Sequence, residues 1–303
     1  MEITIKINYK MFLFLHGVME TNSSLIPLIK STFDLEHEDF SDKVLLDLFT
    51  IQIPGFDDRD TEFEFGQIED RIIEFAETKF EEQNKLAQEL IFCKNQSSIS
   101  SLKENKINII GHEIGGGIGL EFTVKNPELV SSVITLNCGI KFSGIRNHIR
   151  NFHIKIMSKK KIFQLQSLIS KSPKLEDKKL ASILLENPEQ RGFGSYIKMM
   201  NEYNFETIFN RLSISNQIEL AKIPILCIIL KNKGLVSKNQ ITQLGKLIDP
   251  NNNFVKNKHT FIAFDEENKK NFYYKILNDN KSGVFEKENL NNITNQIKEF
   301  LQN

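Results

Sequence analysis

The sequence predicts an α/β fold built on a mainly parallel β-sheet. Short, continuous apolar runs alternate along the chain with longer segments of helical periodicity, which is the order expected when strands are joined by crossover helices. One apolar run, residues 107–110, passes directly into a glycine-rich turn and a helix. The chain has 303 residues, of which 40% are hydrophobic and 26% are charged, enough for one large domain with a buried core.

The composition limits which binding partners and which cellular compartment are expected for this protein. Lys and Arg together number 39, as do Asp and Glu, so the formal net charge is zero and a nucleic-acid surface is not expected. Cys93, Cys138 and Cys227 are widely spaced and form no CxxC pair, which predicts neither a disulfide framework nor a metal site. The apolar run at 11–15 is too short to span a membrane, and no signal peptide is visible. We expect a cytoplasmic protein without stable membrane insertion.

The expected elements follow from the periodicity of apolar residues. Residues 94–106 are polar and predict a surface insertion. Helices are expected at about 20–38, 66–92, 114–126, 237–248 and 284–302. Strands are expected at 1–8, 11–15, 43–53, 107–110, 130–136, 223–230 and, more briefly, 253–256.

The pattern changes between about 140 and 222. This stretch is helical in character, rich in Lys, Met and Phe, and has no apolar run as strong as those of the expected strands. We interpret it as a helical cap inserted over the sheet. The prediction is therefore a single domain, 1–303, with a core at about 1–139 and 223–303 and a cap at about 140–222.

The turn at 111–115 reads Gly-His-Glu-Ile-Gly. Its apex, Glu113, has to stand clear of the sheet, so its backbone is expected in a strained region with positive φ. The flanking glycines allow the following helix to pack close to the strand. The first N–H groups of that helix point into the same space and can hold a negative charge.

These motifs, taken in order, resemble the α/β-hydrolase family over most of the chain. The turn resembles the family's G-x-S-x-G nucleophile elbow with Glu113 in place of Ser. Further segments resemble the family's motifs in the same order along the chain. Before the elbow, His16-Gly17 resembles the oxyanion loop and residues 54–58 resemble the PGFGxS loop. After it, residues 127–137 resemble the strand that follows the elbow helix, residues 223–226 resemble the strand that carries the acid, and His259 stands at the position of the late histidine.

The resemblance implies roles for individual residues. Glu113 stands at the nucleophile position and His259 at that of the base, while His16, Gly17, Val18 and Ile114 would form the oxyanion hole and pocket. The usual acid is missing: Lys233 stands where Asp is expected, and Asn137 stands at the alternative acid position after the preceding strand. The triad is therefore degraded, and serine-type ester hydrolysis is not expected.

Three functions stay open from the sequence. The first is a hydrolase-like protein without cofactor that binds a small apolar or ester-like molecule, or a protein partner, with weak or no turnover. The second is a hydrolase in which Glu113 attacks carbon, as the Asp of epoxide hydrolases and dehalogenases does in this family. The third is a nicotinamide-dinucleotide oxidoreductase, because residues 111–117 also fit a G-x-x-x-G-x-G turn.

Overall fold

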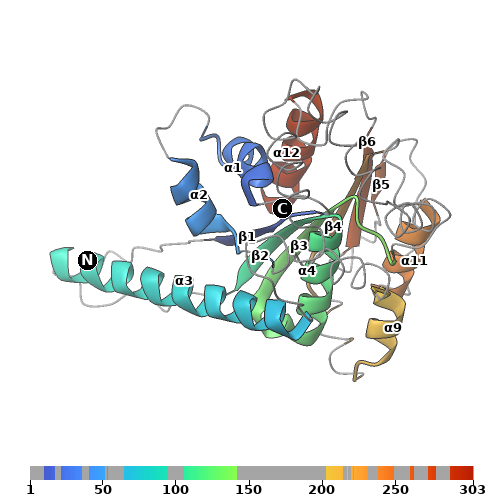
Figure 1. Cartoon of the computed structure of the whole chain (residues 1–303), viewed down its shortest axis with the longest axis horizontal. Coiled ribbons are helices and arrows are strands. Elements are labelled where there is room, and N and C mark those ends of the chain that lie inside the picture. The colour runs from blue at the N-terminus through green and yellow to red at the C-terminus, as the bar shows by residue number, and fades with distance from the viewer. Residues whose placement is uncertain are drawn as a thin grey trace, which may run out of the picture.

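The computed structural model describes a six-stranded sheet with helices on both faces (Figure 1). The sheet order is β1-β2-β3-β4-β6-β5, in which β5 alone is antiparallel to its neighbour. The strands are β1 Met11–Leu15, β2 Ile107–His112, β3 Val130–Leu136, β4 Ile225–Leu230, β5 Thr260–Ile262 and β6 Phe272–Leu277. The described residues are 10–17, 22–35, 41–51, 53, 65–94, 106–141, 203–213, 217, 220, 222–230, 238–248, 260–262, 272–277 and 287–302.

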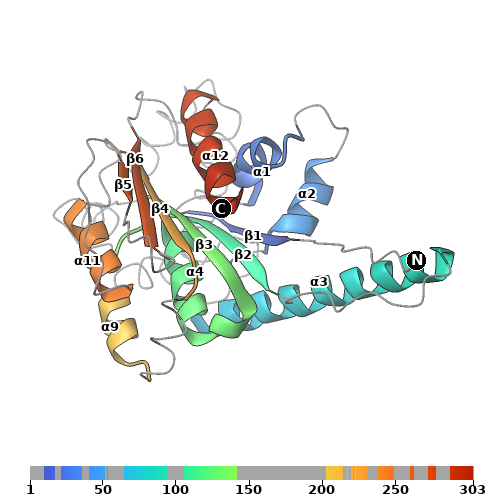
Figure 2. The same cartoon turned by 180° about the vertical axis from the view of Figure 1, so that it is seen from behind.

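The helices form two layers, one on each side of the sheet (Figure 2). The short 3-10 turn η1 Asn22–Leu25 leads into the first helix of the chain, and η2 Pro127–Leu129 leads into β3. One layer contains α1 Ile26–Thr32, α2 Asp42–Phe49 and α12 Lys287–Gln302. The other contains α3 Phe65–Lys94, α4 Ile114–Lys125, α9 Phe205–Asn210 and α11 Lys238–Ile248.

The alternation of side chains along the strands builds a separate apolar core under each layer. In β1, Leu13 and Leu15 belong to the core beneath α3 and α4, whereas Phe12 and Phe14 belong to the core beneath α1 and α12. All five residues of β1 are buried, as expected for a strand covered on both faces. The continuous apolar runs in the sequence therefore correspond to strands inside a three-layer sandwich.

The strand expected at 43–53 is wrong, because residues 42–49 form helix α2. Ser41 caps this helix by accepting a hydrogen bond from the Val44 N–H at 3.3 Å. Leu45 is buried, and the Phe49 ring stacks on Phe33 with centroids 4.8 Å apart, whereas Val44 is 42% exposed. The apolar run is thus a helix with one buried face, and Thr50, which follows the helix, pairs with the sheet through a parallel bridge to Phe14.

Most other expected elements are confirmed within the described residues. The strands at 11–15, 107–110, 130–136 and 223–230 and the helices at 66–92, 114–126, 237–248 and 284–302 all appear, with ends shifted by a few residues. Strand β6 and the hairpin it makes with β5 were not expected. The predictions for 1–8 and 253–256 lie outside the described residues, as do nearly all of the expected insertion at 94–106 and most of the expected cap at 140–222.

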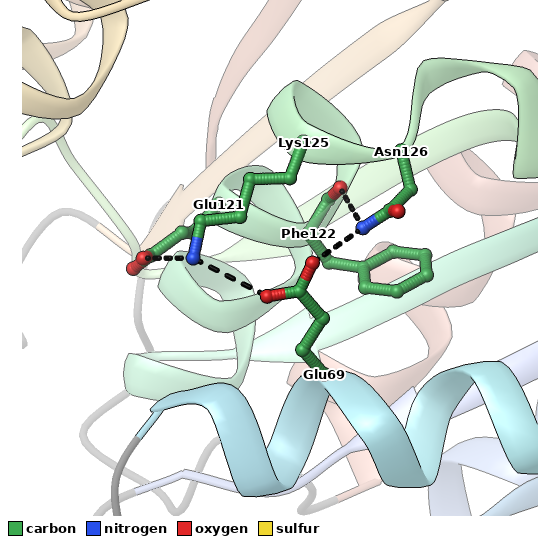
Figure 3. A network of polar contacts seen from close by, with 5 residues as sticks. All are labelled: Glu69, Glu121, Phe122, Lys125 and Asn126. Carbon is green, nitrogen blue, oxygen red and sulfur yellow. Dashed lines mark hydrogen bonds and ion pairs between the residues drawn. The ribbon is translucent and has the colours of Figure 1, made fainter.

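Helices α3 and α4 are joined by a polar network (Figure 3). Glu69 of α3 accepts hydrogen bonds from the Lys125 ammonium at 3.3 Å and from the Asn126 side-chain amide at 2.9 Å. Glu121 lies 3.2 Å from the same ammonium. Burial raises the pKa of the Glu121 carboxyl, and Lys125 offsets this only in part. Two carboxylates therefore share one lysine, and Glu69 has the better set of partners.

We predict that Glu69→Gln and Glu121→Gln have unequal effects on stability. Glu69→Gln replaces one of the two accepting oxygens with an NH2 group and removes the charge that pairs with Lys125, so it should lower the free energy of unfolding by about 1 kcal/mol at pH 7. Glu121→Gln should be neutral or stabilising, because the raised pKa means that ionising Glu121 opposes folding, and this penalty appears as the pH rises through that pKa. Urea unfolding at pH 5 and pH 8 measures both effects. A Glu121→Gln variant that loses more stability at pH 8 than at pH 5 would contradict this assignment.

Candidate functional site

The turn between β2 and α4 holds Glu113 in a strained backbone conformation. Its φ is 46° and its ψ is −114°, in a region that non-glycine residues rarely occupy. The Glu113 N–H donates to the Leu136 carbonyl at 2.7 Å, and the Glu113 carbonyl accepts from the Gly117 N–H at 3.2 Å. The apex is thus fixed from both β3 and α4, and the strain expected at Glu113 is present in the structure.

The glycines on either side of the apex allow the chain to close so tightly. A Cβ built on Gly111 would lie 2.4 Å from the backbone of Gly115. A Cβ built on Gly115 would lie 2.4 Å from the Leu15 carbonyl oxygen and 2.6 Å from that of His16. Any larger residue at these two positions would collide with backbone atoms, so the turn fixes the distance between α4 and the end of β1.

The expected oxyanion loop lies directly against this helix. His16 is buried, and its Nδ1 atom lies 3.1 Å from the Gly17 carbonyl oxygen. Ile114 begins α4, and its side chain is fully buried in the apolar core, so only its backbone N–H can serve a ligand. The structure therefore brings His16, Gly17 and Ile114 together with Glu113 at one end of the sheet. Val18 lies outside the described residues.

The Glu113 side chain is half-buried and makes no capping hydrogen bond to α4. The first N–H groups of a helix have no partner within the helix itself, so an anion or carbonyl oxygen is stabilised there. The negative charge of Glu113 acts on Cys138, which directly follows Asn137 at the end of β3. The elbow thus combines a carboxylate with a helix N-terminus that the carboxylate does not cap.

Two buried thiols lie beneath the elbow. Burial raises the pKa of Cys138 well above its ordinary value, and the neighbouring Cys227 and Glu113 raise it further. Burial also raises the pKa of Cys227 to about 12. Both thiols stay protonated at neutral pH, and neither can replace the missing serine as a nucleophile.

Asn137 has a structural role at the alternative acid position. It adopts a positive φ of 53°, and its N–H donates to the Ile228 carbonyl at 2.8 Å. Its side-chain oxygen accepts a hydrogen bond from the Leu230 N–H, also at 2.8 Å. The amide therefore extends the pairing between β3 and β4, and its oxygen is already engaged by the backbone.

The base and the other acid-position residue, His259 and Lys233, lie outside the described residues, so their roles stay predictions. Thr260, which follows His259, begins the outermost strand of the sheet. Four strand-to-strand steps separate β5 from β2, which amounts to about 19 Å at the usual strand spacing. Among the described residues, no group of His, Cys, Asp or Glu side chains is arranged to hold a metal ion.

One residue of the site had no signal in the sequence. Tyr203, within the expected cap at 140–222, is buried against the first turn of α4. Nothing local distinguishes a single Tyr in a helical stretch, because its contacts are made with residues far away in the chain.

Strain at the apex can be measured by comparing Glu113→Gly with Glu113→Ala. Both variants remove the carboxylate, but only glycine relaxes the backbone at φ 46°. We predict that the glycine variant is more stable than the alanine variant by about 1 kcal/mol. This difference is the strain energy that glycine relieves, less the cost of the greater entropy of glycine in the unfolded chain. Chemical unfolding of the two proteins gives the difference directly. An alanine variant that is the more stable of the two would show that the apex is unstrained.

Comparison with known proteins identifies the fold to which this geometry belongs. No family model matches the chain, and no relative was found among curated protein sequences. Solved structures do match. An enol-lactonase from Burkholderia xenovorans LB400 aligns over 100% of this chain and 95% of its own, with a TM-score of 0.53 and 12% identity.

Two further structures show the same likeness. A putative lipase from Acinetobacter baumannii AYE covers 97% of this chain and 83% of its own, with a TM-score of 0.56 and 14% identity. A haloalkane dehalogenase from Agrobacterium tumefaciens C58 covers 97% of this chain and 90% of its own, with a TM-score of 0.55 and 13% identity. These similar structures are all α/β-hydrolase-fold proteins. With its parallel sheet, its two helical layers and its strained elbow, this chain has the α/β-hydrolase fold.

Proposed function

We propose that this protein binds a small apolar or ester-like molecule at the Glu113 elbow and lacks serine-type hydrolase activity. The observation that carries this proposal is the elbow itself, which keeps its strained apex and its close glycine packing while presenting a carboxylate. Strain at a non-glycine residue persists only where the surrounding structure enforces it, and such residues cluster at functional sites. The fold is hydrolase-like, but a fold alone does not determine activity.

The absence of serine chemistry follows from the group at the apex. Serine hydrolysis needs a hydroxyl that a base can deprotonate, and a carboxylate has no such proton to give. The buried thiols of Cys138 and Cys227 are protonated and supply no alternative nucleophile. A protein of this construction can still hold a ligand without turning it over.

Binding is supported by the position of the elbow. The N-terminus of α4 faces the same end of the sheet as Gly17. The N–H groups at such a helix terminus can donate hydrogen bonds to a carbonyl or ester oxygen of the ligand. Small-molecule sites are typically lined by apolar side chains, which would contact the rest of the ligand. The similar structures include proteins named as a lactonase, a lipase and a dehalogenase, which supports a ligand of this general kind.

A second candidate function is a carboxylate-centred hydrolase. The strained backbone at Glu113 favours it, because strained non-glycine residues cluster at functional sites. A Glu113 oxygen would attack an electrophilic carbon and form an ester, while a halide or an epoxide oxygen leaves with the electron pair. Water would then cleave the ester and restore the carboxylate, with His259 as the proposed base. Glu places its oxygen about 1.5 Å further out than Asp would, a displacement that can lower the rate strongly.

A dinucleotide site gains no support from the described turn. Glycines in such sites let a pyrophosphate approach the backbone. Here the spaces beside Gly115 and Gly117 are filled by the chain's own atoms, the Leu15 and His16 carbonyls in one case and the Tyr203 ring in the other. These glycines serve packing inside the protein.

The proposal is tested by assaying purified protein against an activated ester, an epoxide and a haloalkane, in parallel with Glu113→Gln. The matched control is Glu128→Gln, which makes the same change at an exposed position in the turn before β3. Binding of the unreactive ketone phenylacetone is measured on the same proteins by calorimetry. We predict saturable ketone binding and no turnover that depends on Glu113.

The results of the turnover and binding assays distinguish the binding protein from the carboxylate-centred hydrolase. Epoxide or haloalkane turnover that disappears in Glu113→Gln and survives in Glu128→Gln would establish the carboxylate enzyme in place of the binding protein. Absence of both turnover and ketone binding would contradict a small-molecule site at the elbow.

A further inference from the structure

Strands β3 and β4 end at different levels along the sheet, and Asn137 lies at the step between them. Leu136 is the last residue of β3 to pair with β4, opposite Ile228, whereas β4 continues to Leu230. Asn137 leaves the strand with a positive φ of 53°, a conformation that Asn tolerates better than most residues. Its side-chain oxygen then accepts a hydrogen bond from the Leu230 N–H at 2.8 Å. The side chain thus replaces the backbone acceptor that a longer β3 would supply.

The hydrogen bond between Asn137 and Leu230 is buried. Asn137 is 4% exposed and Leu230 is 2% exposed, so water does not readily replace the amide as a partner. A buried N–H group without an acceptor costs free energy comparable to that of a lost hydrogen bond. A chain without this amide therefore either leaves the Leu230 N–H unpaired or shifts the two strand ends relative to each other.

The peptide group between Leu136 and Asn137 connects these strand ends to the elbow. A trans peptide group is planar, and its C=O and N–H point in opposite directions. On one side, the Leu136 carbonyl accepts a hydrogen bond from the Glu113 N–H at 2.7 Å. On the other side, the Asn137 N–H donates to the Ile228 carbonyl at 2.8 Å. A rotation of this one peptide group would therefore alter both hydrogen bonds together.

The hydrogen bond to Leu136 ties the apex of the elbow to the sheet. The Glu113 carbonyl also accepts from the Gly117 N–H, but that donor belongs to α4, the helix that the apex itself begins. The bond to Leu136 joins the apex to a strand, and at 2.7 Å it is shorter than the bond from Gly117 at 3.2 Å. The direction in which Glu113 leaves the sheet therefore depends on the peptide group that Asn137 shares with Leu136.

We propose that Asn137 is a positioning residue for the Glu113 elbow. By joining the end of β3 to Leu230, its side chain fixes the peptide group that holds the Glu113 N–H. The inference deepens the proposed function and rests on it in treating Glu113 as the working group of the site. The contacts are made within the protein, so they can be measured separately from binding or turnover.

The test is a nuclear magnetic resonance spectrum of protein labelled with ¹⁵N at the glutamate backbone amides. The Glu113 resonance is identified by its absence from Glu113→Gln. Asn137→Gly removes the side-chain acceptor and allows the positive φ, whereas Asn137→Asp keeps an oxygen that can accept from Leu230. The matched control is Asn108→Gly, at another buried asparagine, which lies at the opposite end of β2 from the elbow and donates to the Met11 carbonyl at 2.9 Å.

We expect the Glu113 amide proton of Asn137→Gly to move upfield by more than its linewidth, because its hydrogen bond to Leu136 is weakened. Its exchange with solvent should become about tenfold faster relative to that of the Glu121 amide in α4. A general loss of stability would accelerate exchange at both amides and leave this ratio unchanged. Asn137→Asp should restore the ratio, and Asn108→Gly should alter neither the shift nor the ratio.

An unchanged Glu113 shift and exchange ratio in folded Asn137→Gly would overturn the inference, as would equal changes in Asn108→Gly or an exchange ratio that Asn137→Asp does not restore. If Asn137→Gly fails to fold, Asn137→Ser takes its place, because its hydroxyl oxygen lies one bond closer to the backbone and falls short of Leu230. That variant should move the Glu113 amide in the same direction, and an unchanged amide would overturn the inference. The expected changes in a protein that shows neither ketone binding nor turnover would uphold the positioning role and reject the proposed function.

Discussion

The close contact between Gly115 and the carbonyls that end β1 is the constraint on which the elbow depends. The Leu15 and His16 carbonyl oxygens occupy the space that a side chain at position 115 would need. This contact sets how near α4 approaches the sheet, and it leaves the chain very little length in which to turn from β2 into the helix. The positive φ of Glu113 is the consequence, since one residue has to make that turn alone.

The same constraint separates the architecture of the site from its chemistry. The backbone at the apex is fixed by Leu136, Gly117 and the flanking glycines, none of which requires a particular side chain at position 113. A serine can therefore be replaced by a glutamate without loss of the elbow. What changes is the reaction that the apex can support, because a hydroxyl needs a base whereas a carboxylate is already charged.

Much of this arrangement was predictable from the sequence because it is local. The strand at 107–110, the strained apex and the close-packed glycines all follow from fourteen consecutive residues, and the order of motifs predicted the fold. Helix α2 was mistaken for a strand because Val44, Leu45 and Leu46 form a continuous apolar run, and only tertiary contacts show that Leu45 is buried while Val44 is exposed.

The parts that could not be predicted depend on contacts between distant segments. Strand β6 is a short run of three aromatic residues, one lysine and two aliphatic residues, and it is defined as a strand by its pairing with β4. Tyr203 acquires its place by packing on Gly117, which no local pattern connects to it. Asn137 matched an acid position by its place in the order of motifs, yet its amide completes the pairing of β3 with β4.

A comparison of Gly115→Ala with Gly66→Ala in chemical unfolding tests whether the contact at Gly115 determines the elbow. Both changes add one methyl group to a glycine in a helix, but a Cβ on Gly66 would meet nothing within 4 Å. We predict that Gly66→Ala is neutral or stabilising, because alanine favours helix. Gly115→Ala should lower the free energy of unfolding by more than about 2 kcal/mol, because its methyl group meets backbone atoms that cannot move aside. Equal stabilities of the two variants would contradict the claim that this contact determines the elbow.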